Sequence, residues 1–165
     1  MDRYYVGLDL GQSRDHTAIA VVQRAELKGG WDGVAYAWKK VAALRLRYLE
    51  RMPLGITYPE MVDRVREVVE HRELAGRCTL VVDGTGVGRP VVDLLRDARF
   101  GCNILPVTIT GGDAETSIHG YYGVPKRDLI TNLQVLLQQK KLQVAADLEH
   151  GPLLVKEMSE MQVRI

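Results

Sequence analysis

The first part of the chain alternates between apolar, β-rich runs and short polar turns. Residues 4–10 (YYVGLDL) form the first run, which ends at Gly11, and residues 17–23 (TAIAVVQ) form the second. Gly29-Gly30 marks another reversal, and residues 33–46 form a third strand-like run. Strands joined by short turns pair in the antiparallel direction. The pattern therefore predicts a three-stranded antiparallel meander.

From Thr57 onward the apolar positions recur with the period of a helix. Thr57 is a residue type that caps helices, and Pro59 suits an early helical position. Gly76 is expected to end this helix. The predicted apolar face consists of Met61, Val62, Val65, Val68 and Val69.

A buried strand and a second helix are predicted next. Residues 78–82 (CTLVV) form a short apolar run, which is typical of a strand buried on both faces in a parallel region. The run ends at Asp83, and the loop GTGVG leads into a helix predicted over residues 90–99. Residues 103–109 (NILPVTI) predict a further strand.

The remaining segments complete the predicted fold. Residues 111–123 are polar and glycine-rich without periodicity, which favours a surface loop. Residues 125–139 predict an amphipathic helix, 142–145 an edge strand and 151–161 a last helix, and 162–165 (QVRI) begin like another strand. A meander followed by β-α-β units predicts an α/β fold with a mixed sheet and helices on its faces.

Composition changes this picture little. The 165 residues are 46% apolar and 26% charged, which suits one globular domain spanning residues 1–165. No apolar run reaches the roughly 18 residues of a membrane helix, and the start MDRYY lacks a signal-peptide core. We therefore expect a soluble, non-secreted protein without membrane contact. A net charge of +1 neither indicates nor excludes nucleic-acid binding. Cys78 is expected to be a reduced, buried thiol.

Two aspartates are the main candidates for chemistry. Asp9 lies inside the first apolar run, where a carboxylate loses solvation unless a metal, hydrogen bonds or cations compensate. Asp83 stands at the carboxyl end of the buried strand, where sites collect in parallel sheets. If the two strands are neighbours, the carboxylates emerge together, and oxygen-only ligation suits Mg²⁺ or Mn²⁺. Two such ions roughly 4 Å apart activate water in phosphodiester hydrolysis.

Each of the other candidate residues has a simpler interpretation beside the functional one. Asp83 alone is more typical of a turn former or helix cap, and the loop 84–88 is more typical of a tight turn than of a phosphate cradle. Asp15 suits the turn between the first two strands, with a place near the metal as the alternative. Lys126 and Arg127 begin a helix, where cations oppose the dipole, so they indicate either a phosphate contact or a solvated helix end.

Three segments resemble successive blocks of a known family. GLDLGQSRDHTAIAVV, TLVVDGTGVGRPVVDLL and VPKRDLITNLQVLLQQKKLQV are similar to the nuclease domain of phage terminase large subunits, which are ribonuclease-H-like. The resemblance implies a ribonuclease-H-like sheet and Mg²⁺- or Mn²⁺-dependent cleavage of double-stranded DNA by two ions. It matches Asp9 and Asp83 to the first two catalytic carboxylates, Asp15 to an acidic position after the first strand, and Lys126 to a basic position heading the later helix.

The resemblance also implies partners and two departures. In the family an ATPase motor domain precedes the nuclease, and the portal and the small terminase subunit assist it in the cytoplasm of a bacterial host cell. No Walker motif is present in this sequence, which indicates an isolated domain or a fragment. The family's third carboxylate lies in a later acidic motif that this chain does not contain. Asp147, Glu157 and Glu160 are the possible substitutes.

Three alternatives follow from the same residues. A resolvase of the ribonuclease-H superfamily would cut branched DNA with similar chemistry. A truncated, non-catalytic nuclease core would bind DNA or a packaging partner without cutting. An actin-like ATPase fragment is suggested by the opening residues 7–17, although that fold needs two such domains and 165 residues are too few.

Overall fold

The computed structural model describes residues 3–11, 15–86 and 89–160. Within them, eight strands form one mixed sheet in the order β6-β7-β5-β4-β1-β2-β3-β8. The strands are β1 (Arg3–Asp9), β2 (Ala18–Asp32), β3 (Ala37–Arg51), β4 (Cys78–Asp83), β5 (Asn103–Thr110), β6 (Thr116–Ile118), β7 (Tyr121–Pro125) and β8 (Leu142–Val144). The helices are α1 (Tyr58–Val69), α2 (Arg89–Asp97), α3 (Lys126–Gln138) and α4 (Gly151–Glu160).

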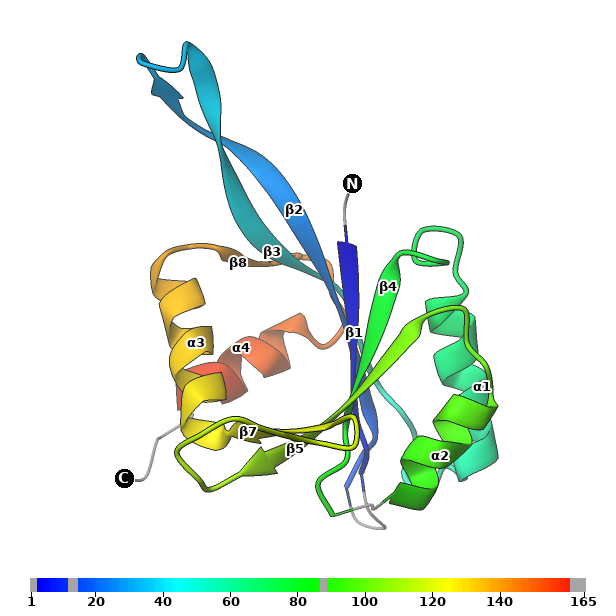
Figure 1. Cartoon of the computed structure of the whole chain (residues 1–165). Helices are drawn as coiled ribbons and strands as arrows, with labels where there is room; N and C mark the ends of the chain where they lie inside the picture. The colour runs from blue at the N-terminus through cyan, green and yellow to red at the C-terminus, as the bar shows by residue number, and fades with distance from the viewer. Residues whose placement is uncertain (1–2, 12–14, 87–88, 161–165) are drawn as a thin grey trace.

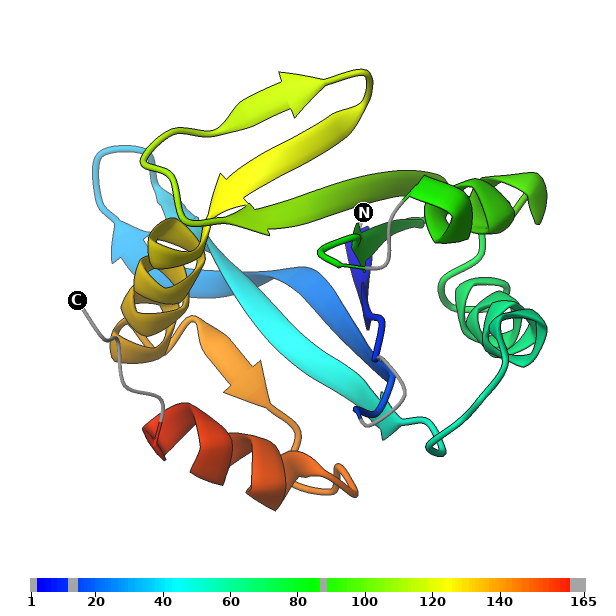
Figure 2. The same cartoon turned by 90° about the horizontal axis from the view of Figure 1, so that it is seen from below.

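The protein has an α/β fold, and its sheet and helices follow a ribonuclease-H-like layout. β1, β2 and β3 form the predicted antiparallel meander, while β4, β5 and β7 continue the sheet in parallel with β1. Helices α1 and α2 cover one face, and α3 and α4 lie on the other (Figures 1 and 2). The predicted fold class is therefore confirmed.

The hydrophobic core lies between the sheet and the helices α1 and α2. Alternate residues of the central strands point into it, and the two helices supply the opposite wall. The fully buried members include Val6, Leu8, Leu80, Val82, Met61, Val65 and Leu95. On the other face α3 buries none of its residues completely. One face of the sheet is thus densely packed, and the other remains more accessible.

Helix α1 begins as the sequence predicts and ends earlier. The Thr57 side chain accepts a hydrogen bond from the Glu60 amide, and the Glu60 carboxylate accepts one from the Thr57 amide, which is a capping box. The expectation that Gly76 ends the helix is wrong, because α1 stops at Val69 and turns follow to residue 77. Gly76 has φ +69°, so it provides the left-handed backbone of the last turn before β4.

The reversal between the second and third strands lies beyond its predicted place. Gly29-Gly30 lies within β2, at a register irregularity between Lys28 and Trp31. The chain reverses at residues 33–36, where the Asp32 carboxylate accepts hydrogen bonds from the backbone amides of the turn. Both strands are 15 residues long and form a ribbon that projects from the sheet (Figure 1). A glycine pair thus forms a bulge where the sequence suggested a turn.

The predicted surface loop at 111–123 contains two strands. β7 pairs in parallel with the end of β5, and β6 pairs antiparallel with β7. Gly123 permits this pairing, because a Cβ there would lie 2.4 Å from the Thr116 hydroxyl oxygen. The predictions of β5, α2, α3, β8 and α4 hold to within two residues at each end, while residues 161–165 lie outside the described part of the chain.

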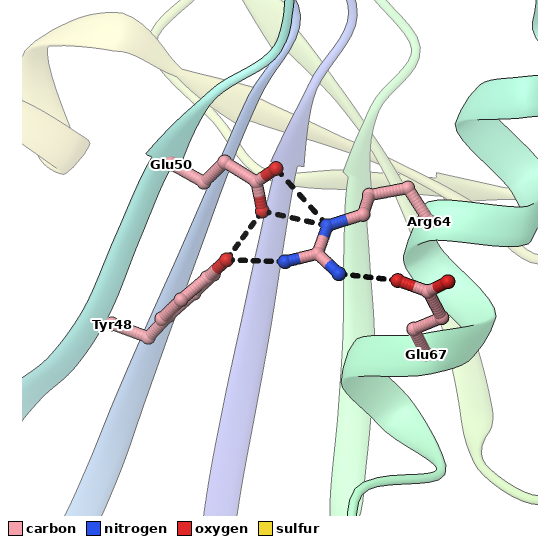
Figure 3. Close-up of polar contacts among 4 residues, drawn as sticks. All are labelled: Tyr48, Glu50, Arg64 and Glu67. Carbon is pink, nitrogen blue, oxygen red and sulfur yellow. Dashed lines mark hydrogen bonds and ion pairs between the residues drawn. The ribbon is translucent and has the colours of Figure 1, made fainter.

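A four-residue polar network attaches α1 to β3 (Figure 3). The Arg64 guanidinium donates to both Glu50 carboxylate oxygens at 3.0 Å, to the Tyr48 hydroxyl at 2.6 Å, and to Glu67. Tyr48 in turn donates to Glu50 at 2.5 Å. Burial alone would raise the pKa of Glu50, but the hydrogen bonds from Arg64 and Tyr48 and the Arg64 charge together hold that pKa below its usual range.

Two free thiols lie next to each other where β4 and β5 begin, whereas Asp9 and Asp83 lie where β1 and β4 end. Cys78 begins β4, Cys102 precedes β5, and the parallel register pairs the residues that follow them, Thr79 and Asn103. Cys78 is buried and unpaired, as predicted. Its hydrogen bond to Cys102 outweighs burial and lowers the pKa of Cys102 to about 7.

Cys102 is therefore expected to react with iodoacetamide in the native protein, with a half-maximal rate near pH 7. Replacing Cys78 by alanine removes the thiol that stabilises the Cys102 thiolate. The midpoint should then move towards about 8.5, the value of an unperturbed thiol. Peptide mass spectrometry of alkylated samples across a pH series measures both midpoints. Equal midpoints in the two proteins would contradict the proposed interaction.

Candidate metal centre

Asp9 and Asp83 are direct neighbours in the sheet. Each is the last residue of its strand, and the parallel register of β1 and β4 pairs one with the other. Adjacent strands lie about 4.8 Å apart, so the two carboxylates leave the sheet side by side. The expectation that the strands are neighbours is confirmed. The metal and catalytic roles of the two residues stay predictions.

Both carboxylates belong to the more accessible face of the sheet. Strand alternation sends Leu8 and Val82 into the core, so Asp9 and Asp83 lie on the opposite side. There they line a cavity of about 370 Å³. Its other lining residues are almost all apolar and come from β1, β2, β4, β5, β7 and α3: Gly7, Leu8, Ala18, Ala20, Val81, Val107, Ile109, Val124 and Leu129.

The arrangement disfavours the charged form of Asp9. Although Asp9 is exposed to solvent, surrounding atoms displace part of its hydration, and this desolvation is the main cause of its raised pKa. The charges of Asp83 and Asp15 raise that pKa further. A divalent cation placed among these carboxylates would reverse all three effects, because its charge compensates both the repulsion and the lost hydration.

Asp83 also shapes the loop that follows β4. Its Oδ1 accepts a hydrogen bond from the Thr85 amide at 2.8 Å, which makes it the turn former that the sequence suggested. Thr85 Oγ1 accepts from the Ile109 amide at 2.9 Å, and the Gly84 amide donates to the Val107 carbonyl at 2.8 Å. The loop is thus anchored on β5. The turn uses Oδ1, so Asp83 could still coordinate an ion through Oδ2.

Gly11 allows Asp15 to lie close to the Asp9–Asp83 pair. A Cβ at Gly11 would lie 2.2 Å from the Asp15 carbonyl oxygen and 2.5 Å from the His16 carbonyl carbon, so this close approach requires glycine. The Gly11 amide donates to Thr17 Oγ1 at 3.2 Å. The backbone of Asp15 therefore packs on Gly11, while its exposed carboxylate acts on Asp9 through charge. The sequence marked Gly11 only as a strand end.

The structure does not bring the candidate third ligands to the pair. Asp147 follows β8 and lines a pocket with Arg45 and Arg47. β2 and β3 separate β8 from β1, and three strand spacings amount to about 14 Å. Glu157 and Glu160 are exposed on α4, which contributes no lining residue to the cavity. Among residues 3–11, 15–86 and 89–160, no three His, Cys, Asp or Glu side chains are grouped to hold a metal ion.

The basic candidates lie near the cavity at the start of α3. Lys126 is the first residue of α3 and is exposed. In the sequence it lies between Val124 and Leu129, which both line the cavity. Arg127 forms an ion pair with Asp113 at 3.1 Å, so its charge is already partly compensated. Lys126 is therefore the better candidate for a phosphate contact. Of the glycine loop, residues 87 and 88 lie outside the described part of the chain, and Gly86 has φ +82°, as a tight turn requires.

Comparisons with known proteins do not assign the chain to a family. The chain matches no protein-family model, and no curated protein matches it. The fold and the carboxylate pair together define an α/β protein with a ribonuclease-H-like sheet and two acidic residues at its central strand ends. In the described part of the chain the longest helix has 13 residues, and none of the helices has the length and apolar character to cross a bilayer.

Proposed function

We propose that this protein is a divalent-metal-dependent endonuclease that hydrolyses phosphodiester bonds of double-stranded DNA, of the type found in viral DNA-packaging terminases. The observation that carries the proposal is the register pairing of Asp9 with Asp83 on the accessible face of the sheet. Partial desolvation, together with the charges of Asp83 and Asp15, raises the pKa of Asp9, which supports a cation as the natural occupant.

The chemistry follows from the ligand type. Carboxylate oxygens suit Mg²⁺ or Mn²⁺, which would complete their coordination with water and with phosphate oxygens of the substrate. Two ions held by Asp9 and Asp83 would activate a water and stabilise the leaving oxygen. Lys126 would contact the phosphate backbone from the start of α3. On this proposal an ATPase motor, the portal and the small terminase subunit are the partners, in the cytoplasm of a bacterial host cell.

Nicking of supercoiled plasmid DNA tests the proposal. With Mn²⁺ the wild-type chain is expected to convert supercoiled to open-circular DNA, and EDTA should stop the reaction. Asp83→Asn keeps the acceptor for the Thr85 amide but weakens metal binding, so its rate should fall at least about 100-fold. Asp147→Asn is the matched control, because Asp147 lies beyond β2 and β3. Cleavage without metal, or equal rates in the Asp83 variant, would refute the proposal.

A second candidate is a nuclease core that binds DNA without cutting it. The positions of Asp147, Glu157 and Glu160, all away from the carboxylate pair, favour this alternative. It predicts that DNA is retarded in a gel while no plasmid is nicked at any Mn²⁺ concentration. Including a four-way junction beside linear duplex in the same assay tests the resolvase alternative, which predicts faster cutting of the junction.

A further inference from the structure

The β2–β3 ribbon projects beyond the rest of the sheet. Its outer part, residues 25–32 and 37–43 with the turn 33–36, is hereafter called the ribbon. β1 pairs with β2 only as far as Arg24, and β8 pairs with β3 only from Leu44 to Leu46. Among the described strands, those of the ribbon therefore pair only with each other, and the ribbon extends away from the sheet (Figure 1).

Aromatic side chains lie exposed at the tip of the ribbon. Trp31 and Trp38 are directly opposite each other, with ring centroids 5.6 Å apart and ring planes at 72°, and they are 53% and 55% exposed. Tyr36 is 82% exposed and has φ +47°, a backbone conformation that costs a non-glycine residue energy. These are the only tryptophans of the chain. Edge-to-face packing stabilises the ribbon but leaves the rings half accessible.

Cations flank the tryptophans on the same face. Lys28 and Lys40 are directly opposite each other, an unfavourable arrangement that Glu26 relieves through its ion pair with Lys40 at 3.0 Å. Arg24 lies further along the same face. The face formed by Arg24, Glu26, Lys28, Trp31, Trp38 and Lys40 is called the basic aromatic face. It has three cations and one carboxylate.

The basic aromatic face continues the side of the sheet that carries the carboxylates. Ala18 and Ala20 line the cavity with Asp9, and residues two apart on a strand share a face, so Arg24 and Lys28 lie on that same side of β2. Trp31 is thirteen residue steps along the strand from Ala18, which is roughly 43 Å of extended strand. A nucleic acid on this side could therefore touch the ribbon far from the carboxylate pair.

We propose that the ribbon, together with Arg24 at its base, binds an unpaired DNA strand, with bases stacked on Trp31, Trp38 and Tyr36 and phosphates beside Lys28 and Arg24. Exposed aromatic rings next to cations form the surfaces that bind single strands, because every base offers a face for stacking. Lysine is depleted in the cores of protein–protein interfaces, which disfavours a protein partner here. The choice of DNA as the nucleic acid rests on the proposed function.

Tryptophan fluorescence measures binding at this site directly, since both tryptophans lie on the ribbon. Oligothymidylate is expected to quench the emission to saturation, and added salt should weaken binding. Tyr36→Ala retains both fluorophores and removes one stacking surface, so affinity should fall between about 5- and 150-fold. Lys28→Glu should weaken binding and reduce its salt dependence, whereas Lys156→Glu, the same charge change on exposed α4, should not.

Several outcomes would overturn the inference. Equal binding by wild type and Tyr36→Ala would exclude stacking, and stronger binding of duplex than of the single strand would exclude an unpaired ligand. Emission that depends on protein concentration without DNA, together with a dimer mass, would assign the tip to contact between copies. Asp83→Asn separates this inference from the nuclease proposal, because quenching should persist in a variant that no longer nicks plasmid. Circular dichroism of each ribbon variant checks that the fold is retained.

Discussion

Arg64→Ala is expected to lower the free energy of unfolding by about 2 kcal/mol at neutral pH. The substitution leaves the Glu50 carboxylate and the Tyr48 hydroxyl, both on β3, without the cation that holds them to α1. Hydrogen bonds to charged groups are among the stronger ones, and a partly buried carboxylate that loses its cation has a desolvation cost. For a chain of 165 residues the melting temperature should fall by roughly 4–8 °C.

The pH dependence distinguishes this network from general loss of packing. The pKa of Glu50 is lowered in the folded protein, so its contribution is present above the pKa of the unfolded carboxyl and is lost as the pH falls through the folded value. The difference between wild type and Arg64→Ala should therefore shrink in acid. Urea unfolding at neutral and acidic pH measures this, with Arg72→Ala, an exposed residue in the turns after α1, as the matched control. A difference that is independent of pH would contradict the ionic explanation.

The central strands and their carboxylates were predictable because local patterns determine them. The run 4–10 and the run 78–82 are strongly apolar, and each has an aspartate at or near its end. The meander and β-α-β order then makes the two strands neighbours. Strand alternation separates Asp9 and Asp83 from the core residues without further information. The juxtaposition thus follows from short-range pattern and a few rules of chain topology.

The features that could not be predicted from the sequence depend on contacts between residues far apart in the chain. Gly29-Gly30 has the composition of a turn, but the Trp31–Trp38 pair and the Asp32 hydrogen bonds fix the reversal further along. β7 is recognisable only through its pairing with β5, since residues 121–125 have no strand-like alternation. The distance from Asp147 to the carboxylate pair is likewise set by strand order, which the local sequence does not encode.

Mn²⁺ is expected to stabilise the wild-type protein but not Asp9→Asn. At a free metal concentration ten times the dissociation constant, binding adds about 1.4 kcal/mol. For a domain of this size that corresponds to a rise of roughly 3–6 °C in melting temperature. Asp9→Asn removes one of the two neighbouring carboxylates, so Mn²⁺ should raise the melting temperature of this variant much less. Asp147→Asn should retain the wild-type shift, since that residue lies away from the pair.

Without metal, Asp9→Asn should instead raise the free energy of unfolding relative to wild type. The pKa of Asp9 is raised on folding by desolvation and by Asp83 and Asp15, so above the unfolded value of about 3.9 the folded state binds more protons. Stability therefore decreases as the pH rises through this window, and the charged carboxylate is unfavourable at neutral pH. Asp9→Asn should then gain at most about 0.5 kcal/mol in EDTA, because solvent screens an exposed group, and the gain should vanish in acid. Thermal melts in EDTA and in Mn²⁺ across a pH series measure both effects. An equal Mn²⁺ shift in Asp9→Asn and wild type would show that the ion binds elsewhere, because only a cation at the carboxylate pair requires Asp9.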